Sequence, residues 1–588
     1  MVEHDGAAQV AAITAGYAFD GPTLHLGAAL VGGTLHDDAQ VRLPLAMMNR
    51  HGLIAGATGT GKTVTLQVLA EQLSAQGVPV FLSDIKGDLT GLTTPGTASE
   101  RLTKRTASVG QDWRPTGFPV EFLSLGGGEG IPVRATVSSF GPLLLSRVLD
   151  LNETQESSLQ LVFHYADRNG LELYDLADLR AVIGFLTSDE GKDALASLGG
   201  LSRATAGVIL RELVTLEAQG MDTFFGEPEF DTADLLRTAP DGRGIITALE
   251  LVSVQQKPRL FSTFLMWLLA DLFAELPEVG DVDKPRLVFF LDEAHLLFTG
   301  SSKAFRESIQ ATVRLIRSKG VGIFFITQTP KDVPGEVLGQ LANRIQHALR
   351  AFTPDDAKAL RATVSTFPMS AYDLEEVLTS AGIGEAVVTV MNERGAPTPV
   401  AWTRLRSPES VMGRAPEGTV PAVVASSPLL ARYSQAVDRH SAYEKLTGRA
   451  GTVPTGAPGT PSGGSGTVGE PAASRQARDD EARRIEEEIL GLPSRPAPRR
   501  ADGPPRDERR DRARAEGRSS ERSGGDSRDD RDGGYTDPYD GGYRTGGTPQ
   551  RRGPDRDEMA DLALKAAGVI GKELARGLFG TKRRKRPW

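Results

Sequence analysis

Eight consecutive residues near the start of the chain have the types and the spacing needed to hold a triphosphate. Residues 56–63 read GATGTGKT and fit the pattern G-x-x-x-x-G-K-[ST] at every position, with an apolar run before them and a helical pattern after them. The glycines of such a loop let backbone N–H groups turn inward around the phosphates, and the helix that follows adds its positive dipole. The predicted nucleotide-binding residues are Gly56, Ala57, Thr58, Gly59, Thr60, Gly61, Lys62 and Thr63.

Two residues of this loop have predicted roles beyond the backbone. Lys62 would neutralise the β- and γ-phosphates, and the hydroxyl of Thr63 would bind Mg²⁺. The loop by itself does not distinguish an ATPase from a GTPase or a kinase. A second acidic element must therefore decide the chemistry.

That element follows an apolar run much later in the chain. Residues 286–291 read RLVFFL, which is typical of a buried strand, and they end in Asp292 and Glu293. We expect Asp292 to hold the Mg²⁺ shell and Glu293 to polarise the attacking water. The pair predicts hydrolysis of ATP with Mg²⁺ as cofactor. A scaffold that binds nucleotide without hydrolysing it conflicts with Glu293.

Three more polar residues follow apolar runs, and ligands of parallel sheets lie at the carboxyl ends of the strands. Gln328 ends the run 321–327, so it would sense the γ-phosphate or the water; the alternative is that it caps the loop before Pro330. Asp84 and Lys86 follow the run after the phosphate-loop helix. We expect them near the Mg²⁺ or a neighbouring subunit.

Two arginines lie on one face of the helix predicted before residue 321. Arg314 and Arg317 are three residues apart, so they project from the same side of a helix. One of them could reach the nucleotide of an adjacent subunit as an arginine finger. The alternative is that both stabilise the helix C-terminus electrostatically. His295, which follows the acidic pair, is assigned no role.

The apolar runs that carry these residues are short and alternate with helical patterns. Strands buried on both faces read as continuous apolar runs, and alternation with helices predicts a parallel sheet with right-handed crossovers. The fold class is therefore α/β, with three layers and a mostly parallel sheet. The predicted strands are 52–55, 78–83, 120–125, 244–251, 286–291, 322–327 and 345–352.

Two parts of the chain depart from this alternation. Residues 138–222 show helical patterns only, with Asn152 and Gln155 as a capping box and Ser202 as a helix cap, and we interpret them as an all-helical insertion. The alternative is that these helices are ordinary crossovers. After Arg449 the composition shifts to Gly, Pro, Ser, Thr and charged residues, which predicts a disordered tail.

The tail ends in a pattern of its own. Residues 555–579 have helical apolar spacing and precede the basic run 582–586. An amphipathic helix with a basic end suits a membrane surface, an acidic protein or nucleic-acid phosphates. The alternative is a solvated tail that docks weakly or not at all.

Composition sets further bounds on function. The 588 residues contain no cysteine, which excludes disulfides, thiolate metal sites and cysteine nucleophiles. The net charge of −9 gives no overall attraction to nucleic acid, so any DNA contact needs a local basic surface. No apolar stretch is long enough to span a bilayer and the start lacks a secretory pattern, so a cytoplasmic location is expected.

Taken together, the motifs resemble the HerA/FtsK superfamily of hexameric motor ATPases, and more closely its YjgR-like, HerA-like branch. The residues that carry the resemblance are 49–63, 84–88, 224–228, 291–296 and 325–328. The resemblance implies a hexamer and a double-stranded DNA substrate, with Arg317 at the position of the trans-acting arginine and Arg314 as the second choice. HerA-type motors carry an N-terminal β-barrel, and too few residues precede the phosphate loop here for one. No nuclease motif is evident.

These inferences combine into one organisation and two functions. We expect a ring-forming, helicase-type ATPase that translocates DNA; the alternative is an ATP-dependent switch that acts on a protein partner or membrane surface through its tail. The predicted segments are a short β segment (1–45), a RecA-like P-loop core in two parts (46–137 and 223–448), the helical insertion (138–222), a disordered linker (449–554) and an amphipathic helix with a basic end (555–588).

Overall fold

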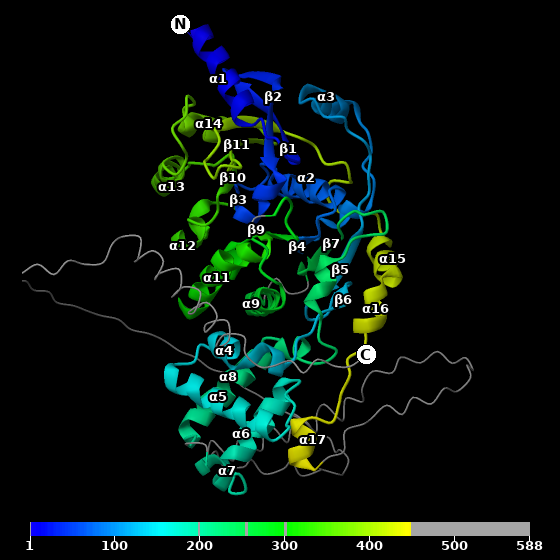
Figure 1. The fold of residues 1–588 in the computed structure, drawn as a ribbon, viewed down its shortest axis with the longest axis vertical. Coiled ribbons are helices and arrows are strands. Elements are labelled where there is room, and N and C mark those ends of the chain that lie inside the picture. Colours follow the sequence, from blue (N-terminus) through cyan, green and yellow to red (C-terminus); the bar gives the residue numbers. More distant parts are fainter. Residues whose placement is uncertain (1, 198–199, 253–256, 281, 299–302, 449–588) are drawn as a thin grey trace, which may run out of the picture. The chain divides into compact units, whose positions relative to one another are not determined.

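The computed structural model describes residues 2–448, apart from 198–199, 253–256, 281 and 299–302 (Figure 1). The predicted disordered linker and the predicted terminal amphipathic helix lie outside the described residues. Within the part of the chain that the structure describes, no helix combines the length and the apolar character needed to cross a membrane.

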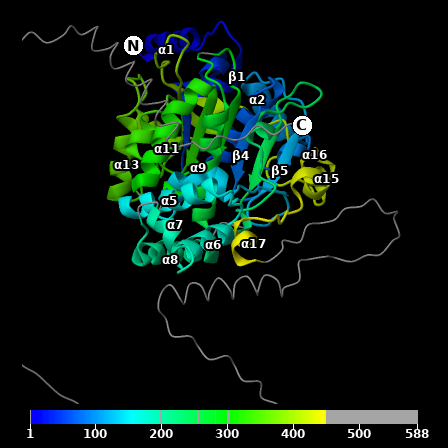
Figure 2. The same ribbon diagram turned by 60° about the horizontal axis from the view of Figure 1, so that its bottom comes forward.

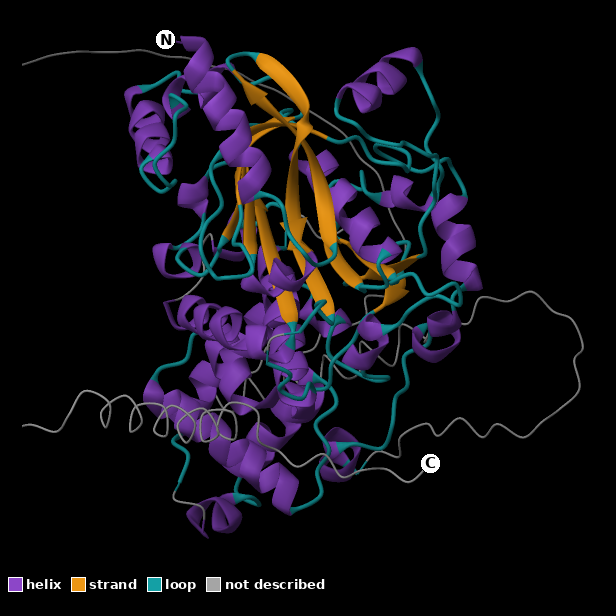
Figure 3. Ribbon diagram, turned by 45° about the horizontal axis from the view of Figure 1, so that its top comes forward, coloured by secondary structure: helices purple, strands orange, loops and turns teal. Residues whose placement is uncertain are grey.

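The strands of the described residues join into one 12-stranded sheet with helices on both sides (Figure 3). Their order is β2-β1-β12-β11-β10-β3-β9-β8-β4-β7-β5-β6. The strands are β1 Thr23–Val31, β2 Thr34–Pro44, β3 Gly52–Ala55, β4 Val80–Asp84, β5 Val120–Ser124, β6 Ile131–Pro132, β7 Ile246–Glu250, β8 Leu287–Leu291, β9 Val321–Thr327, β10 Asn343–His347, β11 Glu385–Thr389 and β12 Ala401–Leu405.

The sheet is parallel where the functional motifs lie and antiparallel at one side. All neighbours from β10 to β6 pair in parallel, whereas the neighbours from β2 to β10 pair antiparallel. The predicted α/β class with a mostly parallel sheet is confirmed. Each of the seven predicted apolar runs overlaps a strand, but the run 345–352 is a strand only as far as His347.

The alternation of side chains along each strand separates two cores. In β8, Leu287, Phe289 and Leu291 face the core that includes apolar residues of the helices on one side. Val288 and Phe290 face the other core, which includes apolar residues of the phosphate-loop helix. Because successive strand residues point to opposite faces, a continuous apolar run fills both cores at once.

The helices that cover the sheet or lie beside it have the following bounds. They are α1 Val2–Gly16, α2 Lys62–Ala75, α3 Glu100–Ser108, α4 Val137–Val148, α5 Glu153–Arg168, α6 Leu176–Thr187, α7 Lys192–Ser197, α8 Arg203–Ala218, α9 Pro258–Glu275, α10 His295–Phe298, α11 Lys303–Ile316, α12 Gly335–Leu338, α13 Pro354–Val364, α14 Leu374–Ser380, α15 Thr419–Ser426, α16 Pro428–Tyr433 and α17 Ala442–Thr447.

The range interpreted as a helical insertion holds α4 to α8. The Asn152 side chain accepts a hydrogen bond from the Gln155 amide, the Gln155 side chain accepts one from the Asn152 amide, and Ser202 caps α8, as their spacing predicts. Helices α5, α6 and α8 pack on one another, and α17 packs on α6 (Figure 2). The predicted motif residue Phe224 lies in the same core, edge-on to Phe264 of α9, so its role is packing.

The predicted N-terminal β segment begins with a helix instead. Residues 7–12 are rich in alanine, the strongest helix former, and α1 ends at Gly16. Ile13 and Tyr17 are buried against the antiparallel side of the sheet. The Tyr17 hydroxyl lies 2.9 Å from the Pro399 carbonyl oxygen, so tertiary packing holds this end of α1.

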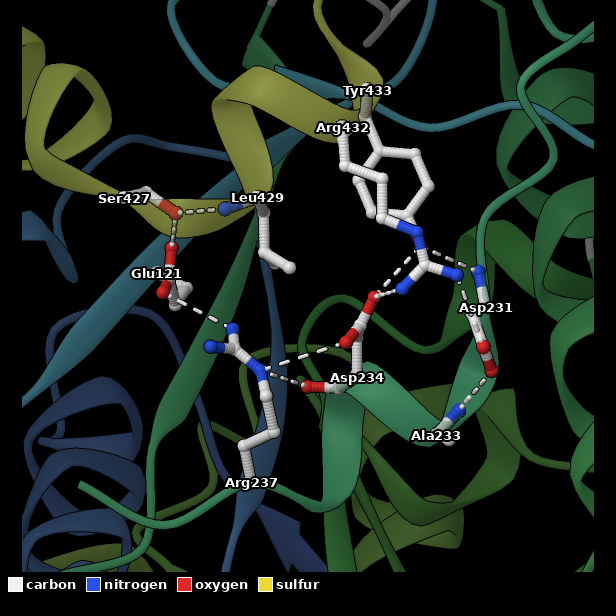
Figure 4. Close-up of polar contacts among 9 residues, drawn as sticks. All are labelled: Glu121, Asp231, Ala233, Asp234, Arg237, Ser427, Leu429, Arg432 and Tyr433. Carbon is white, nitrogen blue, oxygen red and sulfur yellow. Dashed lines mark hydrogen bonds and ion pairs between the residues drawn. The ribbon is translucent and has the colours of Figure 1, made fainter. Parts of the chain in front are cut away.

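The last described elements are fastened by a polar cluster (Figure 4). Arg432 of α16 forms ion pairs with Asp231 and Asp234, at 3.2 and 3.0 Å. The Tyr433 hydroxyl donates to Asp234 at 2.7 Å and accepts from the Asp231 amide at 3.0 Å. These contacts hold the chain after β12 against residues that precede β7.

Candidate active site

The predicted phosphate loop connects β3 to α2, as its flanking patterns indicate. Gly56, Gly59 and Gly61 have φ angles of 155°, 80° and 112°, a region that favours glycine. A Cβ on Gly56 would also lie 2.4 Å from the Cβ of His347. The loop therefore needs glycine at residue 56 for space as well as for backbone conformation.

Lys62 lies inside this loop rather than on the surface. Its side chain nitrogen donates hydrogen bonds to the carbonyl oxygens of Gly56 at 2.8 Å and Ala57 at 3.2 Å. Burial lowers the pKa of Lys62, although Glu293 and Asp292 oppose that shift. The cation is thus held at the centre of the loop by neutral dipoles, where a phosphate would offer it a stronger partner.

His347 forms the floor of the loop, although no sequence motif marks it. This histidine ends β10, is fully buried, and has Nε2 2.9 Å from the Thr65 hydroxyl. Burial lowers its pKa to about 4, so the ring is neutral at physiological pH. The next residue, Ala348, accepts the Ala57 amide at 2.8 Å. The loop therefore rests on β10 as well as on its own strand.

The acidic pair follows β8 at the same edge of the sheet as the phosphate loop. The buried amide of Asp292 donates to Ser83 at 2.9 Å, and one Asp292 carboxylate oxygen accepts the Glu293 amide at 2.9 Å. Burial raises the pKa of Asp292 to about 6. Glu293 has a φ of 47°, which is uncommon for a residue with a side chain and clusters at functional sites.

Lys86 meets Glu293 directly. The Lys86 Nζ lies 2.6 Å from Glu293 Oε1, with the side chains 46% and 10% exposed. Burial opposes ionisation of Glu293, but the hydrogen bond and charge of Lys86 outweigh it and lower the pKa of the carboxylate. Burial likewise opposes the charge of Lys86, and Glu293 raises its pKa. His295, assigned no role from the sequence, has Nδ1 3.4 Å from Glu293 Oε2.

Asp84 shapes the loop that carries Lys86. Its carboxylate oxygens accept the amides of Gly87 at 2.7 Å, Asp88 at 3.2 Å and Leu89 at 3.0 Å. Burial raises its pKa to about 6 despite these donors. Both oxygens of Asp84 accept hydrogen bonds from the loop backbone. Asp84 thereby fixes the conformation of the loop that carries Lys86.

Gln328 follows β9, which lies between β3 and β8 in the sheet. The parallel register aligns Ala55 with Thr327 and Leu291 with Phe325, so the three strands end close together. Gln328 is exposed there. The predicted neighbourhood of the phosphate loop, the acidic pair and Gln328 is thus present in the structure.

The oxygen donors at this edge fit Mg²⁺. This ion keeps several waters and binds through one or two carboxylates together with substrate phosphates. Asp292 would supply the carboxylate, and Thr63, the second residue of α2, would supply the hydroxyl. The described residues contain no group of three or more His, Asp or Glu side chains that could hold a metal ion.

The two arginines lie elsewhere. Arg314 is in the last turn of α11 and Arg317 begins the 3₁₀ helix η6 (Arg317–Lys319), just before β9. They are therefore at the amino end of β9, whereas the phosphate loop follows the carboxyl end of its neighbour β3. The structure does not bring them into the phosphate site of their own chain.

A second buried histidine, which no catalytic motif marks, connects the amino end of β9 to the residue before the phosphate-loop strand β3. His51, just before β3, is fully buried, with Nε2 2.7 Å from the Val313 carbonyl oxygen. Its Nδ1 accepts the Ile323 amide at 3.0 Å. Burial lowers its pKa to about 4, which agrees with a neutral ring that donates from one nitrogen and accepts at the other.

Comparison with known proteins finds similarity to DNA repair helicases and to a plasmid coupling protein. The DNA double-strand break repair helicase HerA of Saccharolobus solfataricus is 20% identical over 365 residues, and that of Sulfurisphaera tokodaii is 23% identical over 366. Each match covers 62% of this chain and 66% of the relative, just under two thirds of its length. The plasmid coupling protein TrwB in complex with the ATP analogue ADPNP is 15% identical, with a TM-score of 0.44 over 68% of this chain and 98% of that one.

The family itself follows from a longer match. Residues 31–486, more than half of the chain, match the family described as helicase HerA-like C-terminal. This span includes the phosphate loop, the acidic pair and Gln328. The resemblance to the HerA/FtsK superfamily is confirmed, and the chain belongs to the helicase HerA-like C-terminal family of P-loop ATPases.

Proposed function

We propose that this chain hydrolyses ATP with Mg²⁺ and uses the energy to move along double-stranded DNA as a ring-shaped homo-oligomer. The observation that carries the proposal is the arrangement at one sheet edge. Lys62, Asp292, Glu293 and Lys86 come from three separate stretches of sequence, and the Lys86–Glu293 pair is in contact. Residues of this kind can promote phosphoryl transfer by positioning the reactants and by stabilising the charge that develops.

Each residue has a proposed part in that reaction. The loop amides and Lys62 hold the phosphates, while Thr63 and Asp292 would hold the ion that neutralises developing charge. Glu293 accepts a hydrogen bond from the attacking water and orients it toward the γ-phosphate. Gln328 would contact the same water or the γ-phosphate from the adjacent strand end.

The position of the arginines supports an oligomer. Arg314 and Arg317 lie at the amino end of β9, away from their own phosphate loop, so an arginine finger from this helix would serve a neighbouring subunit. We propose Arg317 for that role, with Arg314 as the second choice. A hexameric ring is the assembly that the family resemblance favours.

Double-stranded DNA is the proposed substrate because the curated relatives are named as DNA double-strand break repair helicases. The chain carries a net charge of −9, so DNA contact would come from a local basic surface inside a ring. We propose a cytoplasmic location. The family match favours this motor over the tail-operated switch.

Steady-state ATP hydrolysis with and without duplex DNA tests this proposal. We expect DNA to stimulate turnover, and the stimulation to weaken steeply as salt rises because bound counterions are released from DNA. Hydrolysis that no form of DNA changes at low salt would remove DNA as the substrate and would favour a protein partner.

A further inference from the structure

The phosphate site fixes the direction in which a nucleotide must lie. Asp292 and Glu293 follow β8, which is separated from β3 only by β9, so the γ-phosphate end points to that side of the phosphate loop. The other neighbour of β3 is β10. The ribose and base therefore extend toward β10 and the connection that joins it to β11.

Two loops of this connection are fastened to the phosphate loop. The Ala57 amide donates to Ala348, directly after β10, at 2.8 Å, and the Gly384 amide, directly before β11, donates to Thr60 at 2.9 Å. Because β10 and β11 are antiparallel, the chain leaves and re-enters the sheet at the same edge. Both loops therefore border the phosphate loop on the side where the base must lie.

The second loop is also held from behind. Arg105 of α3 donates to the Gly384 carbonyl oxygen at 2.8 Å and to that of Leu405 at 3.2 Å. A Cβ on Gly384 would lie 2.5 Å from the Arg105 guanidinium, so the turn is packed closely against it. Ile383, immediately before this turn, is thus presented on a fixed backbone.

Large apolar side chains are exposed on this connection to an unusual degree. The three most exposed ones in the described residues all belong to it: Met369, Phe352 and Ile383, at 102%, 82% and 77%. In the first loop, Leu349 and Ala351 pack against a small core while Phe352 does not. Exposed apolar surface beside a polar site marks a binding surface.

We propose that Phe352 and Ile383 form the surface on which the base of the bound nucleotide packs. An aromatic ring and a branched aliphatic chain suit the flat, apolar face of a purine. A polyphosphate has no base, so it cannot make this contact. The inference rests on the proposed function, because it deepens the same ATP site. A second copy of the chain is the other occupant that this surface could take, and the experiment distinguishes the two.

Titration calorimetry of the full chain with Mg²⁺ and either ATP or inorganic tripolyphosphate tests the inference. We expect Phe352→Ala and Ile383→Ala each to weaken ATP binding on the order of tenfold, and to leave tripolyphosphate binding unchanged. Leu315→Ala is the matched control, since Leu315 is another exposed apolar residue but lies at the opposite end of the strands. Phe352→Trp should retain ATP affinity, and its fluorescence should respond to ATP but not to tripolyphosphate.

The other outcomes separate the inference from the proposed function. Unchanged ATP affinity in both alanine variants, or an equal loss for ATP and tripolyphosphate, would overturn the base surface. A change of oligomeric state with unchanged ATP affinity would assign the surface to a second copy and overturn it too. If the wild-type chain binds neither ligand, or Lys62→Ala binds both as well as the wild type does, the proposed phosphate site itself fails.

Discussion

The ammonium group of Lys86 and the carboxylate of Glu293 lie 2.6 Å apart although 207 residues separate them in sequence. The contact joins the loop after β4 to the residue proposed to orient water. It keeps Glu293 ionised in a place where burial opposes its charge. Lys86 is therefore a positioning residue whose effect is expected in the pH dependence of catalysis.

Lys86→Met should move the acid limb of the kcat profile to higher pH. In the wild type, Lys86 outweighs burial and holds the pKa of Glu293 below its usual range, so Glu293 remains a base as pH falls. Without Lys86, burial is opposed only by the smaller effects of His295 and Lys62, so that pKa should rise. Measurement of kcat for ATP hydrolysis against pH reads the shift.

Lys86→Arg and Lys104→Met serve as controls for this prediction. Arginine keeps a positive charge near Glu293, so the acid limb should stay near its wild-type position. Lys104 is an exposed lysine paired with Glu100, and its loss should change nothing. An acid limb that Lys86→Met leaves in place would show that the ion pair does not control Glu293 during turnover.

Arg317→Ala should lower kcat by roughly 10³-fold if this arginine stabilises charge at a neighbouring site. Co-expressed Arg317→Ala and Lys62→Ala chains should then recover activity, because the first binds ATP and the second supplies Arg317. ATPase assays of the two variants alone and together measure this recovery.

Two further variants complete that experiment. Arg168→Ala removes an exposed arginine from α5 and should retain the wild-type rate. Arg314→Ala mixed with Lys62→Ala tests the second choice in the same way. No recovery in either mixture would contradict an arginine acting between subunits.

His51 should contribute a loss of stability as pH falls from 6.5 toward 4, whereas buried carboxyl groups with raised pKa values, such as Asp84 and Asp292, contribute in the opposite direction. The buried ring stays neutral in the folded chain until about pH 4, whereas the unfolded chain binds a proton near 6.5. The unfolded state thus binds more protons in this window, which costs about 1.4 kcal/mol per pH unit. Chemical denaturation at several pH values measures the slope.

His51→Gln should remove the His51 contribution to this slope even if it lowers stability overall, because glutamine does not titrate. His347 contributes a slope of the same sign, so the comparison with wild type isolates His51. His440→Gln replaces an exposed histidine and should leave the slope as it is. A slope that His51→Gln does not change would mean that this ring is protonated in the folded chain.

The sequence was sufficient for those parts of the site that depend on local pattern. Residues 56–63 are predicted as a phosphate loop because the glycines and the flanking runs are contiguous in the sequence. The apolar run 286–291 predicts a strand, and this strand places the acidic pair at its carboxyl end. Residues 1–45 are predicted as a β segment, but α1 forms there because the alanines of residues 7–12 strongly favour a helix.

Contacts between distant segments could not be predicted in the same way. Lys86 and Glu293 were each candidates, but their ion pair depends on β4 and β8 being neighbours in the sheet. His347 carries no motif, and it underlies the phosphate loop only because β10 pairs with β3. The roles of such residues can be inferred only when the order of the strands in the sheet is known.

Steady-state ATP hydrolysis by Glu293→Gln, beside its ATP binding and with duplex DNA present, tests the proposed motor most directly. We predict that the variant binds ATP with wild-type affinity and that its turnover falls by at least about 10²-fold, as expected for the loss of a general base. The control variant Glu278→Gln, at an exposed position, should keep the wild-type turnover. Wild-type, DNA-stimulated turnover in Glu293→Gln would contradict the assignment of hydrolysis to this site.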